Sequence, residues 1–559
     1  MKHSSKVSLV LLLVIMVFLS ACSSGNNDPD NETVKQTEAS PEKDKETDTE
    51  PIAKSAPTGL PEKYDPPIEL TTVTTTAGWI KYPEGEDADH NVWIRMLEEE
   101  YGISVKHLWT ADGGSYPEKI NLAIASGQLP DFFWVGGDQL QQLADADLIE
   151  DLTDVYKNYA PKVITDVMDE AGPLVLESAT INGKLMAIPW TGFNQENVPM
   201  VWVRDDWRTN LNLPEPKTME DLLAISEAFT TQDPDNNGID DTYGIGMDKD
   251  FGSIQGFLNG YHAYRNIWIE DGNGGLKYSS IQPEMKDALA KLQQMYATKQ
   301  IDPEFGVKSS SKYYEDIGTN KLGIVYRIRS ASALQSQTPT AEWRPYVSPS
   351  IDNNPAKMQH ELNVSGYWVV KKGTKNPEAV LKMAELFMNA FYFNTSDEVF
   401  ERLVDDKNGH GAIYTFAPVE IYRPFNNYNG YLEIQKFKNG EVKLEDLTPL
   451  YRNFYNGLKD YEDGNKEAWN QNAANGPLGS GYVLGEYIKN DQFMPNQFTT
   501  TPTPTMISKL PNLLDMELEM MTKIVTGGPL SEFDKFVDNW NKLGGKEIEA
   551  EVNEWYQNK

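Results

Sequence analysis

Oxygen-bearing side chains alternate along one segment in a way that suits a metal ion. Asp233, Asp235 and Asn237 occupy alternate positions, and Gly238 follows as the sixth residue. This spacing fits the first half of an EF-hand loop, in which glycine permits the sharp turn that brings the oxygens together around Ca²⁺. The twelfth position holds Gly244 instead of the usual bidentate glutamate, so a ligand late in the loop must complete the shell. A polar turn without metal is the alternative. The candidate ligands of a structural Ca²⁺ site are Asp233, Asp235, Asn237, Ile239, Asp241 and Thr242.

The chain lacks the common sequence signatures of catalysis. It contains no G-x-S-x-G, no H-E-x-x-H and no phosphate-binding GxxxxGK[ST] segment. Its six histidines are scattered without metal-ligand spacing, and His262 is the one that could touch a ligand. A glycoside hydrolase needs two carboxylates flanking a cleft, and among 84 acidic residues such pairs arise by chance. We therefore expect no enzyme. A surface glycoside hydrolase or lyase is the alternative, and an adhesin without small ligand is a third hypothesis.

The composition excludes several classes of partner. The 559 residues are 39% hydrophobic, which is sufficient for folded cores in roughly two to four domains. The net charge of −34 argues against nucleic acid, which requires clustered positive charge, and against adhesion to anionic lipid. A single cysteine permits neither an internal disulfide nor a Cys-based zinc site.

The first 22 residues have the features of an export signal with a lipid attachment point. Lys2 and Lys6 precede the apolar run 9–19, which has the length of a signal-peptide core and is short for a bilayer of about 30 Å. Small residues then lead to Cys22, the only cysteine in the chain. This pattern is typical of a lipobox, in which the signal peptide 1–21 is removed and Cys22 is acylated. An ordinary secretory signal is the alternative. We expect a lipid-anchored protein on the extracellular face of the cell membrane.

Residues 22–65 form a predicted acidic tether. The segment is rich in acids and lysines and has almost nothing large and apolar. Such a composition does not offset the entropy of ordering the backbone, so the segment is predicted to be disordered. The folded part of the chain is expected to begin at residue 66.

From residue 66 onward, strand and helix patterns alternate. β-branched runs predict strands, and apolar residues at helical spacing predict helices, which end before Gly102 and Gly127. The alternation predicts an α/β fold with a parallel sheet, in which ligands bind beyond the carboxyl ends of the strands. The predicted strands are 68–75, 103–109 and 131–135, the predicted helices are 91–101 and 116–126, and the segments beyond the strand ends are 76–85, 109–115 and 134–138.

Residues 121–131, with the sequence NLAIASGQLPD, resemble a segment of bacterial extracellular solute-binding proteins of family 1. The resemblance is to the lipoprotein branch that serves oligosaccharide ABC importers, and it spans residues 66–559. Further segments match this branch in the same order along the chain. They are Leu148–Leu152, Asn182–Lys184 with Ile188–Pro189, Val201–Trp207, Gln282–Glu284 with Ile301–Pro303, Pro502–Met506, and Gly528–Leu530 with Trp540–Gly544.

The resemblance implies a periplasmic-binding-protein-like fold of type II, in which a hinge joins two α/β lobes and the ligand binds in the cleft between them. We expect the first lobe to comprise residues 66–190 and 317–372. The second, helix-rich lobe is expected to comprise residues 191–316 and 373–559. Closure about the hinge would present the loaded protein to a transporter.

The function that the resemblance implies is that of a membrane-tethered substrate-binding component of an ABC importer. The protein would capture an oligosaccharide in the cleft and deliver it unchanged to permease subunits in the membrane. The chain has no nucleotide-binding motif, so the ATPases must be separate proteins. We expect the binding protein itself to be a monomer.

Sugar sites combine stacking aromatic rings with hydrogen bonds from Asp, Asn or Arg side chains. Positions at strand ends and at the expected lobe crossings indicate which of the 13 tryptophans and 27 tyrosines are candidates, although core packing claims most aromatic residues. The expected ligand contacts are Trp79, Tyr82, Trp134, Asp138, Trp190, Phe193, Asn194, Tyr261, Tyr264, Trp268, Tyr326, Arg327 and Arg329.

Two of these candidates bear on the charge of the ligand. Arg327 and Arg329, with Arg204 and Arg344 as further candidates, would suit the carboxylate of a uronic acid. The net negative charge of the chain weakly opposes an anionic ligand. Salt screens charges beyond about 8 Å, so arginines close to the ligand would determine whether it binds. The sequence leaves neutral and uronate-containing oligosaccharides both open.

Overall fold

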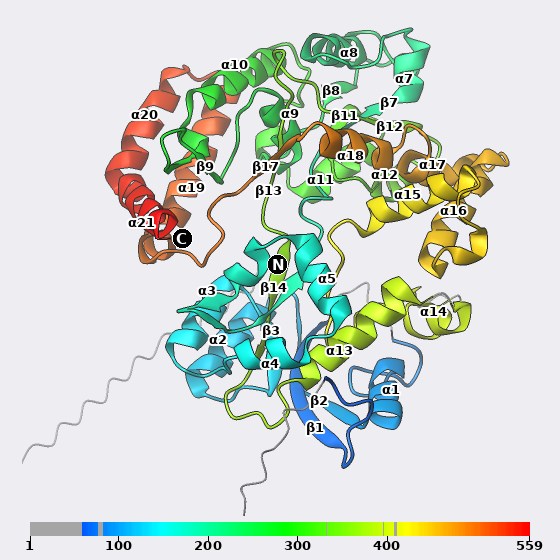
Figure 1. The fold of residues 1–559 in the computed structure, drawn as a ribbon. Coiled ribbons are helices and arrows are strands. Elements are labelled where there is room, and N and C mark those ends of the chain that lie inside the picture. The colour runs from blue at the N-terminus through cyan, green and yellow to red at the C-terminus, as the bar shows by residue number, and fades with distance from the viewer. Residues whose placement is uncertain (1–58, 77–81, 331, 395, 407–410, 559) are drawn as a thin grey trace, which may run out of the picture. The chain divides into compact units, whose positions relative to one another are not determined.

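The structure is a computed structural model that describes residues 59–76, 82–330, 332–394, 396–406 and 411–558 (Figure 1). Cys22, most of the expected tether and Trp79 lie outside these residues. Three clusters of buried apolar side chains organise the described part. We refer to the residues of one cluster, from 64–188 and 368–421, as the first lobe. The residues of the other two, from 198–358 and 469–552, are the second lobe.

The strands of the first lobe follow the order that the sequence predicts, with one difference in pairing. β1 (Ile68–Thr76) and β2 (Ile103–Asp112) pair in parallel, as expected. β3 (Phe132–Val135) pairs instead with β14 (Val364–Val370), which runs antiparallel between β3 and β6 (Ile188–Thr191). Side chains join β1 to β3, because the Thr72 hydroxyl donates to the Phe132 carbonyl at 2.8 Å.

Local sequence explains the helices of the first lobe. In α1 (Val92–Tyr101) the Asn91 side chain accepts hydrogen bonds from two backbone N–H groups of the first turn, and Gly102 ends the helix with φ of 67°. The buried face of α1 carries Trp93 and Leu97. The other helices are α2 (Tyr116–Ser126), α3 (Gly137–Asp145), α4 (Thr153–Tyr159), α5 (Lys162–Ala171), α6 (Leu174–Ser178), α13 (Ala379–Met388) and α14 (Asp397–Leu403), and the short strands are β4 (Thr180–Ile181), β5 (Lys184–Leu185), β15 (Asp405–Asp406) and β16 (Gly411–Ala412).

The second lobe is built on a four-stranded sheet with the order β12 (Trp343–Tyr346), β7 (Met200–Arg204), β11 (Leu322–Arg327) and β8 (Tyr243–Ile245). The central strand β7 is buried along its whole length and runs antiparallel to both neighbours. Two further pairs are β9 (Trp268–Glu270) with β10 (Leu276–Tyr278) and β13 (Met358–His360) with β17 (Phe493–Pro495).

Thirteen further helices lie in the described residues between 205 and 557. The helices α15 and α16 pack with α17 and α18. None of the described helices is both long and apolar enough to cross a membrane. The helices are α7 (Asp205–Asn210), α8 (Met219–Thr231), α9 (Gln255–Gly260), α10 (Pro283–Ala297), α11 (Ser310–Gly318), α12 (Ser332–Gln337), α15 (Asn426–Lys438), α16 (Pro449–Glu462), α17 (Trp469–Asn475), α18 (Ser480–Lys489), α19 (Pro504–Val525), α20 (Ser531–Trp540) and α21 (Lys546–Gln557). Shorter helical turns are Gly252–Ile254, Ser279–Ile281, Phe305–Val307, Asn389–Phe393, Ile413–Phe416, Leu444–Asp446, Lys466–Ala468 and Asn541–Gly545.

The division of the chain between the lobes differs from the expected boundaries. The segment 317–372 was assigned to the first lobe, but β11 and β12 pair within the second-lobe sheet and only β14 belongs to the first. Gly323 fits there because Phe229 leaves no room for a Cβ atom, with its ring 2.1 Å from the position of such an atom. The start of segment 373–559 was assigned to the second lobe, but α13 packs in the first, where the Phe387 ring lies 6.2 Å from that of Trp93.

Three segments, which we name the crossing segments, carry the chain between the two lobes: 192–199, 361–363 and 422–425. Hydrogen bonds tie them together close to their ends in the first lobe. The Asn194 side chain donates to the Leu362 carbonyl, and the Thr191 hydroxyl donates to the Tyr422 carbonyl at 2.6 Å. A change in the orientation of the lobes would require the backbone dihedral angles of these crossing segments to change.

Candidate functional site

Aromatic side chains line a cavity of about 240 Å³ in the first lobe. We name it the aromatic cavity. Its rings come from segments that are far apart in the sequence, and its polar lining includes His107 and Glu420. The aromatic residues are Tyr82, Trp134, Trp190, Trp368, Tyr414, Phe416 and Tyr422.

Three neighbouring strands place the three tryptophans on one face of the sheet. Trp368 of β14 lies opposite Trp134 of β3, and Trp190 of β6 lies opposite Gly366, two residues before Trp368. The ring of Trp190 lies 5.7 Å from that of Trp134 and 5.8 Å from that of Trp368. A Cβ atom at Gly366 would lie within 3.6 Å of the Trp134 and Trp190 rings, so glycine permits this convergence. Trp134 is held in turn by Tyr116, whose ring stacks on it at 4.3 Å.

A carboxyl group lies beside these rings. The Tyr422 hydroxyl donates to Glu420, and the Trp368 indole N–H donates to the Glu420 backbone carbonyl at 3.0 Å. Burial raises the pKa of Glu420 to about 7, although the hydrogen bond from Tyr422 acts in the opposite direction. The indole N–H of Trp190 is buried and has no acceptor among the described residues. Stacking rings with a few polar groups are the combination that binds sugars.

A second cavity, of about 400 Å³, lies in the second lobe. We name it the tyrosine–arginine cavity. Residues of β11 and α11 form its wall, and Asn197 and Pro199 of the first crossing segment border it. Its lining residues that bear on ligand binding are Asp248, Ser253, Tyr313, Tyr314, Tyr326 and Arg327.

The structure brings together five of the ligand contacts that the sequence predicts, in two groups. Tyr82, Trp134 and Trp190 line the aromatic cavity, and Tyr326 and Arg327 line the tyrosine–arginine cavity. Trp134, Trp190 and Arg327 lie at or near the ends of β3, β6 and β11.

Two further candidates lie in the first crossing segment, and a third lies apart. The ring of Phe193 lies 5.1 Å from that of Tyr422, and Asn194 is occupied by its bond to Leu362. Asp138 is exposed in the first turn of α3 and is not among the lining residues of the aromatic cavity.

Tyr261, Tyr264 and Trp268 are buried, at 7%, 5% and 4% exposure. Trp268 packs against Tyr278 in the second-lobe core, with ring centres 5.3 Å apart. Tyr264 lines a separate cavity together with His262. Tyr261 and Trp268 belong to the second-lobe core, and Tyr264 lies outside both named cavities, so we leave the three out of the proposed ligand contacts.

Several residues of the aromatic cavity are not among the ligand contacts that the sequence predicts. Trp368 lies in β14, far along the chain from Trp134 and Trp190, and Glu420 and Tyr422 fall in a segment that the sequence predicts for the other lobe. A signal was present, since the stretch TFAPVEIYRP combines aromatic and acidic residues with prolines that forbid a long helix. This stretch alone does not reveal that β14 pairs with β3 and β6, and that pairing places Trp368 beside Trp134 and Trp190.

The remaining arginine candidates are paired within the protein. Arg204 binds Asp206 at 2.7 Å, and Arg344 binds Glu215 at 2.8 Å. Arg329 is buried, and its Nε lies 3.8 Å from Glu196, a fully buried carboxyl within the first crossing segment. Burial raises the pKa of Glu196, and the charge of Arg329 partly offsets this effect.

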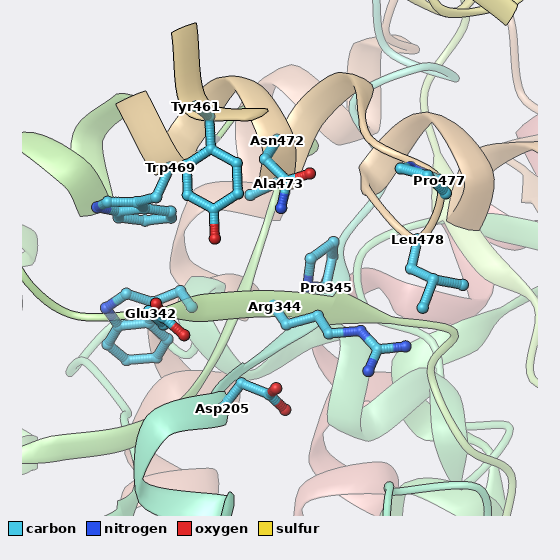
Figure 2. Close-up of a pocket in the computed structure, with 11 residues that line it drawn as sticks. Asp205, Glu342, Arg344, Pro345, Tyr461, Trp469, Asn472, Ala473, Pro477 and Leu478 are labelled. Carbon is cyan, nitrogen blue, oxygen red and sulfur yellow. The ribbon is translucent and has the colours of Figure 1, made fainter. Parts of the chain in front are cut away.

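Arg344 lines a different cavity, of about 330 Å³, between β12, the helices α16 and α17 and the residues Pro477 and Leu478 that follow α17 (Figure 2). Figure 2 shows Tyr461 and Trp469 on one side of this cavity and Arg344 on the other. It contains none of the ligand contacts that the sequence predicts apart from this arginine.

The predicted calcium loop folds back on itself. Both carboxylate oxygens of Asp233 accept backbone hydrogen bonds, from Asn237 at 3.1 Å and Gly238 at 3.0 Å. The Asn237 amide lies 3.0 Å from Asp235 and 3.4 Å from Asp241, so the side chains of the expected ligands meet at one place. Burial and the neighbouring Asp233 raise the pKa of Asp235, whose Oδ1 is buried without a partner in the described region.

Not every expected ligand joins this arrangement. The Thr242 hydroxyl donates to the Phe229 carbonyl at 2.7 Å, away from the carboxylates, and Ile239 contributes only backbone atoms. Among the described residues, no group of three Asp, Glu, His or Cys side chains is arranged to hold a metal ion. Asn237 is the residue that fills the space between Asp235 and Asp241.

Comparison with known proteins shows the family. Residues 93–403 match the family described as bacterial extracellular solute-binding protein. Lipoprotein LipO of Bacillus subtilis is 24% identical over 504 residues, which are 84% of this chain and 89% of LipO. FusA of Streptococcus pneumoniae, a fructooligosaccharide ABC transporter substrate-binding protein, is 30% identical over 163 residues, which are 27% of this chain and 30% of FusA.

Solved structures agree in fold. FusA in complex with kestose superposes with a TM-score of 0.61 at 18% identity, covering 88% of this chain and 99% of FusA. An EF-hand mutant of FusA in complex with fructo-nystose gives the same TM-score at 17% identity, with the same coverage. An HMO-binding solute-binding protein of Bifidobacterium longum infantis gives 0.63 at 16% identity, covering 88% of this chain and 98% of the other. The two-lobe α/β fold is thereby confirmed, and the chain belongs to the family of bacterial extracellular solute-binding proteins.

Proposed function

We propose that the protein is the substrate-binding component of an ABC importer and that it binds an oligosaccharide reversibly between its two lobes. The observation that carries this proposal is the aromatic cavity, because three tryptophan rings converge there beside polar groups. Sugar rings present C–H faces to such surfaces and hydroxyls to the polar groups. LipO, FusA and the HMO-binding protein support the proposal by their family and by the names they carry.

Calorimetry of the purified protein against a panel of oligosaccharides tests this function. Saturable binding, with the sugar recovered intact by chromatography, supports it. Release of shorter sugars would favour the alternative of a glycoside hydrolase or lyase, and a panel without any binding would contradict the proposal.

The lining of the aromatic cavity favours binding over hydrolysis. Among the described lining residues the cavity has one carboxyl group, that of Glu420. Glycoside hydrolases of the usual kinds place two carboxyl groups about 5 to 10 Å apart across the scissile bond. Here the second carboxyl is missing from the lining, so we propose capture and release without chemistry.

Anchoring at Cys22 is part of the same proposal. The lipobox pattern and the similarity to a protein named as a lipoprotein both support an acylated cysteine at the start of the mature chain. A lipid anchor would keep the binding protein near a membrane permease after export.

The pKa of Glu420 predicts how stability depends on pH. An ordinary glutamate has a pKa of 4.5, and burial raises that of Glu420 to about 7 in the folded protein. The folded state therefore holds a proton that the unfolded state releases, and this contribution to stability is lost as pH rises from about 4.5 to about 7. Glu420→Gln removes the titration at nearly the same size. From about pH 5 to pH 7.5, the melting temperature of the wild type should fall relative to that of Glu420→Gln.

Thermal unfolding of both proteins across this range is the measurement. Glu150→Gln, a change at a carboxyl of the first lobe that lies away from the aromatic cavity, is the control; it keeps Glu420, so its melting temperature should also fall relative to that of Glu420→Gln as pH rises. If the melting temperatures of the wild type and Glu420→Gln change in parallel with pH, the pKa of Glu420 is not raised.

We further propose that the loop 233–242 binds a structural Ca²⁺. The side chains of Asp235, Asn237 and Asp241 converge in this loop, and the buried Oδ1 of Asp235 has no hydrogen-bond partner among the described residues. Both features support a bound cation. Rotation of the Asn237 amide would turn its oxygen towards the carboxylates, and the Ile239 carbonyl is a further ligand of the kind that EF-hands use. The EF-hand of FusA supports the same assignment.

Calcium should raise the melting temperature of EDTA-treated protein, with saturable uptake in equilibrium dialysis below about 1 mM. Asp235→Asn should abolish both effects, because it removes charge from the centre of the loop. Asp240→Asn, at an exposed position of the same loop, should retain both. Wild-type protein without uptake and without a thermal shift would exclude the site.

A further inference from the structure

Arg327 differs from every other arginine of the protein. The described part of the chain contains ten arginines, and nine of them form an ion pair with an aspartate or glutamate. Arg327 forms none with any described residue, in a chain with 84 acidic residues against 50 basic ones. The nine paired arginines are Arg95, Arg204, Arg208, Arg265, Arg329, Arg344, Arg402, Arg423 and Arg452.

The guanidinium of Arg327 also lacks hydrogen-bond acceptors. Its Nε and Nη1 are buried, and neither has a partner among the described residues. The group lies over the ring of Tyr314, with 5.1 Å between its central carbon and the ring centre. A buried N–H without an acceptor costs free energy that an incoming oxygen atom would recover.

Other unpaired groups line the same tyrosine–arginine cavity. The hydroxyls of Tyr313 and Tyr326 are buried and have no hydrogen-bond partner in the described region. Three side chains with unsatisfied polar atoms therefore border one cavity of about 400 Å³. Native interiors leave few polar atoms unpaired, so such a concentration indicates that a polar ligand completes the site.

The carboxylate that lines this cavity, that of Asp248, already accepts hydrogen bonds from two serine side chains. Asp248 accepts a hydrogen bond from the Ser253 hydroxyl at 3.0 Å and another from the Ser310 hydroxyl at 3.3 Å. It forms no ion pair with Arg327 in the structure. The positive charge of Arg327 is thus left for a ligand, while Asp248 is placed to accept hydrogen bonds from hydroxyl groups.

We propose that the tyrosine–arginine cavity binds a carboxylate of the ligand, so that the oligosaccharide captured by this protein is acidic and contains uronic acid. The inference rests on the proposed function and deepens it. A sugar hydroxyl would satisfy an N–H group but would leave the charge uncompensated. A carboxylate does both, because its two oxygens match the fork of a guanidinium. The Tyr313 and Tyr326 hydroxyls then bond the carboxylate or the neighbouring ring hydroxyls.

The position of the cavity agrees with a role in lobe closure. Asn197 and Pro199 of the first crossing segment border it, and Ile328, the next residue after Arg327, lies beside them in the lining. A carboxylate held by Arg327 therefore lies next to the segment that must change conformation when the lobes move.

Matched ligands test the proposal directly. The wild-type protein is titrated by calorimetry with oligogalacturonides and oligoguluronates of two to six units, and with the same oligosaccharides after methyl esterification. We expect at least one acidic ligand to bind about 10- to 100-fold more tightly than its ester, the range for losing hydrogen bonds to a charged group. The affinity for the acid should fall as salt is raised from about 50 mM to 500 mM, and that for the ester should not.

Variants then identify the residue. Arg327→Gln should bind the acid about 10- to 100-fold more weakly and the ester as the wild type does. Arg327→Lys keeps the charge and loses the fork, so it should retain part of the preference for the acid. Arg208→Gln, in α7 of the second lobe and paired with Asp205 at 2.7 Å, lies outside both named cavities; it is the matched control and should leave both affinities unchanged. Thermal unfolding of each variant establishes that it is folded.

The outcomes separate the two proposals. Neutral oligosaccharides that bind as tightly as acidic ones, or an Arg327→Gln variant with wild-type affinity for the acid, would overturn the inference and leave the importer function intact. A failure of all oligosaccharides, acidic, esterified or neutral, would overturn both. If Arg327→Gln does not fold, the comparison of acid with ester in the wild type decides the question alone.

Discussion

Glu196→Ala is expected to lower the free energy of unfolding by about 3 to 5 kcal/mol, the range for breaking one side of a buried ion pair. The carboxyl is fully buried and lies 3.8 Å from Arg329. It also accepts hydrogen bonds from the Tyr428 backbone N–H at 2.7 Å and from the Asn427 side chain at 3.2 Å. The change leaves a buried guanidinium without its carboxylate and removes the contact between the first crossing segment and α15. Chemical denaturation measures the loss.

Two further variants distinguish the cause. Glu215→Ala removes the partner of Arg344 at a more exposed site, so it should cost no more than about 1 kcal/mol. Glu196→Gln combined with Arg329→Met removes both charges and keeps similar volumes, so it should recover most of the stability lost in Glu196→Ala. If the double variant is as unstable as Glu196→Ala, the unpaired charge of Arg329 does not account for the loss of stability.

Trp190→Ala is expected to weaken oligosaccharide binding at least 30-fold, because truncating an aromatic anchor at the centre of a binding site costs about 2 kcal/mol or more. Its ring contacts those of Trp134 and Trp368, so its loss removes one wall of the aromatic cavity and loosens the other two. Trp190→Phe keeps an aromatic face and loses the indole N–H, which has no acceptor among the described residues. Trp190→Phe is therefore expected to lower the affinity for the oligosaccharide by only about 5- to 10-fold.

Calorimetry with the best ligand of the panel measures both affinities. Trp555→Ala is the matched control, because this half-buried ring packs against Phe498 in the second lobe, 5.1 Å away and outside either cavity. It should lower stability and leave the affinity unchanged. Wild-type affinity in Trp190→Ala, with the variant folded, would show that the sugar does not bind in the aromatic cavity.

Much of the local structure is predictable from sequence. The α1 helix begins at its Asn91 cap and ends at Gly102, and the α2 helix ends before Gly127, as predicted. These features follow from short-range physics, since a cap side chain or a glycine acts within one turn. The parallel pairing of β1 with β2 also follows, because a helix connects them.

The candidate site is less predictable, because its residues meet through pairing over long sequence distances. The sequence indicates Trp134 by its strand end and Trp190 by an expected lobe crossing, but Trp368 joins them only because β14 inserts between β3 and β6. Glu420 and Tyr422 reach the same cavity from a segment about 50 residues further along the chain. Trp268 shows the opposite failure, since its loop suited a ligand contact and its side chain is buried in the core.

The alternating α/β pattern, the acidic character of the chain and most of the short elements follow from composition and from patterns within a few residues. The family follows from the resemblance of segments such as residues 121–131 to known solute-binding proteins. The tertiary structure decided which segments belong to each lobe and which rings form the aromatic cavity. It also showed that Arg327 has no acid partner among the described residues, whereas Arg329 has one in Glu196. The two arginines are two residues apart on one strand end, and only the packing around them separates their roles. Pairing and burial are properties of contacts between distant segments, which no local pattern specifies.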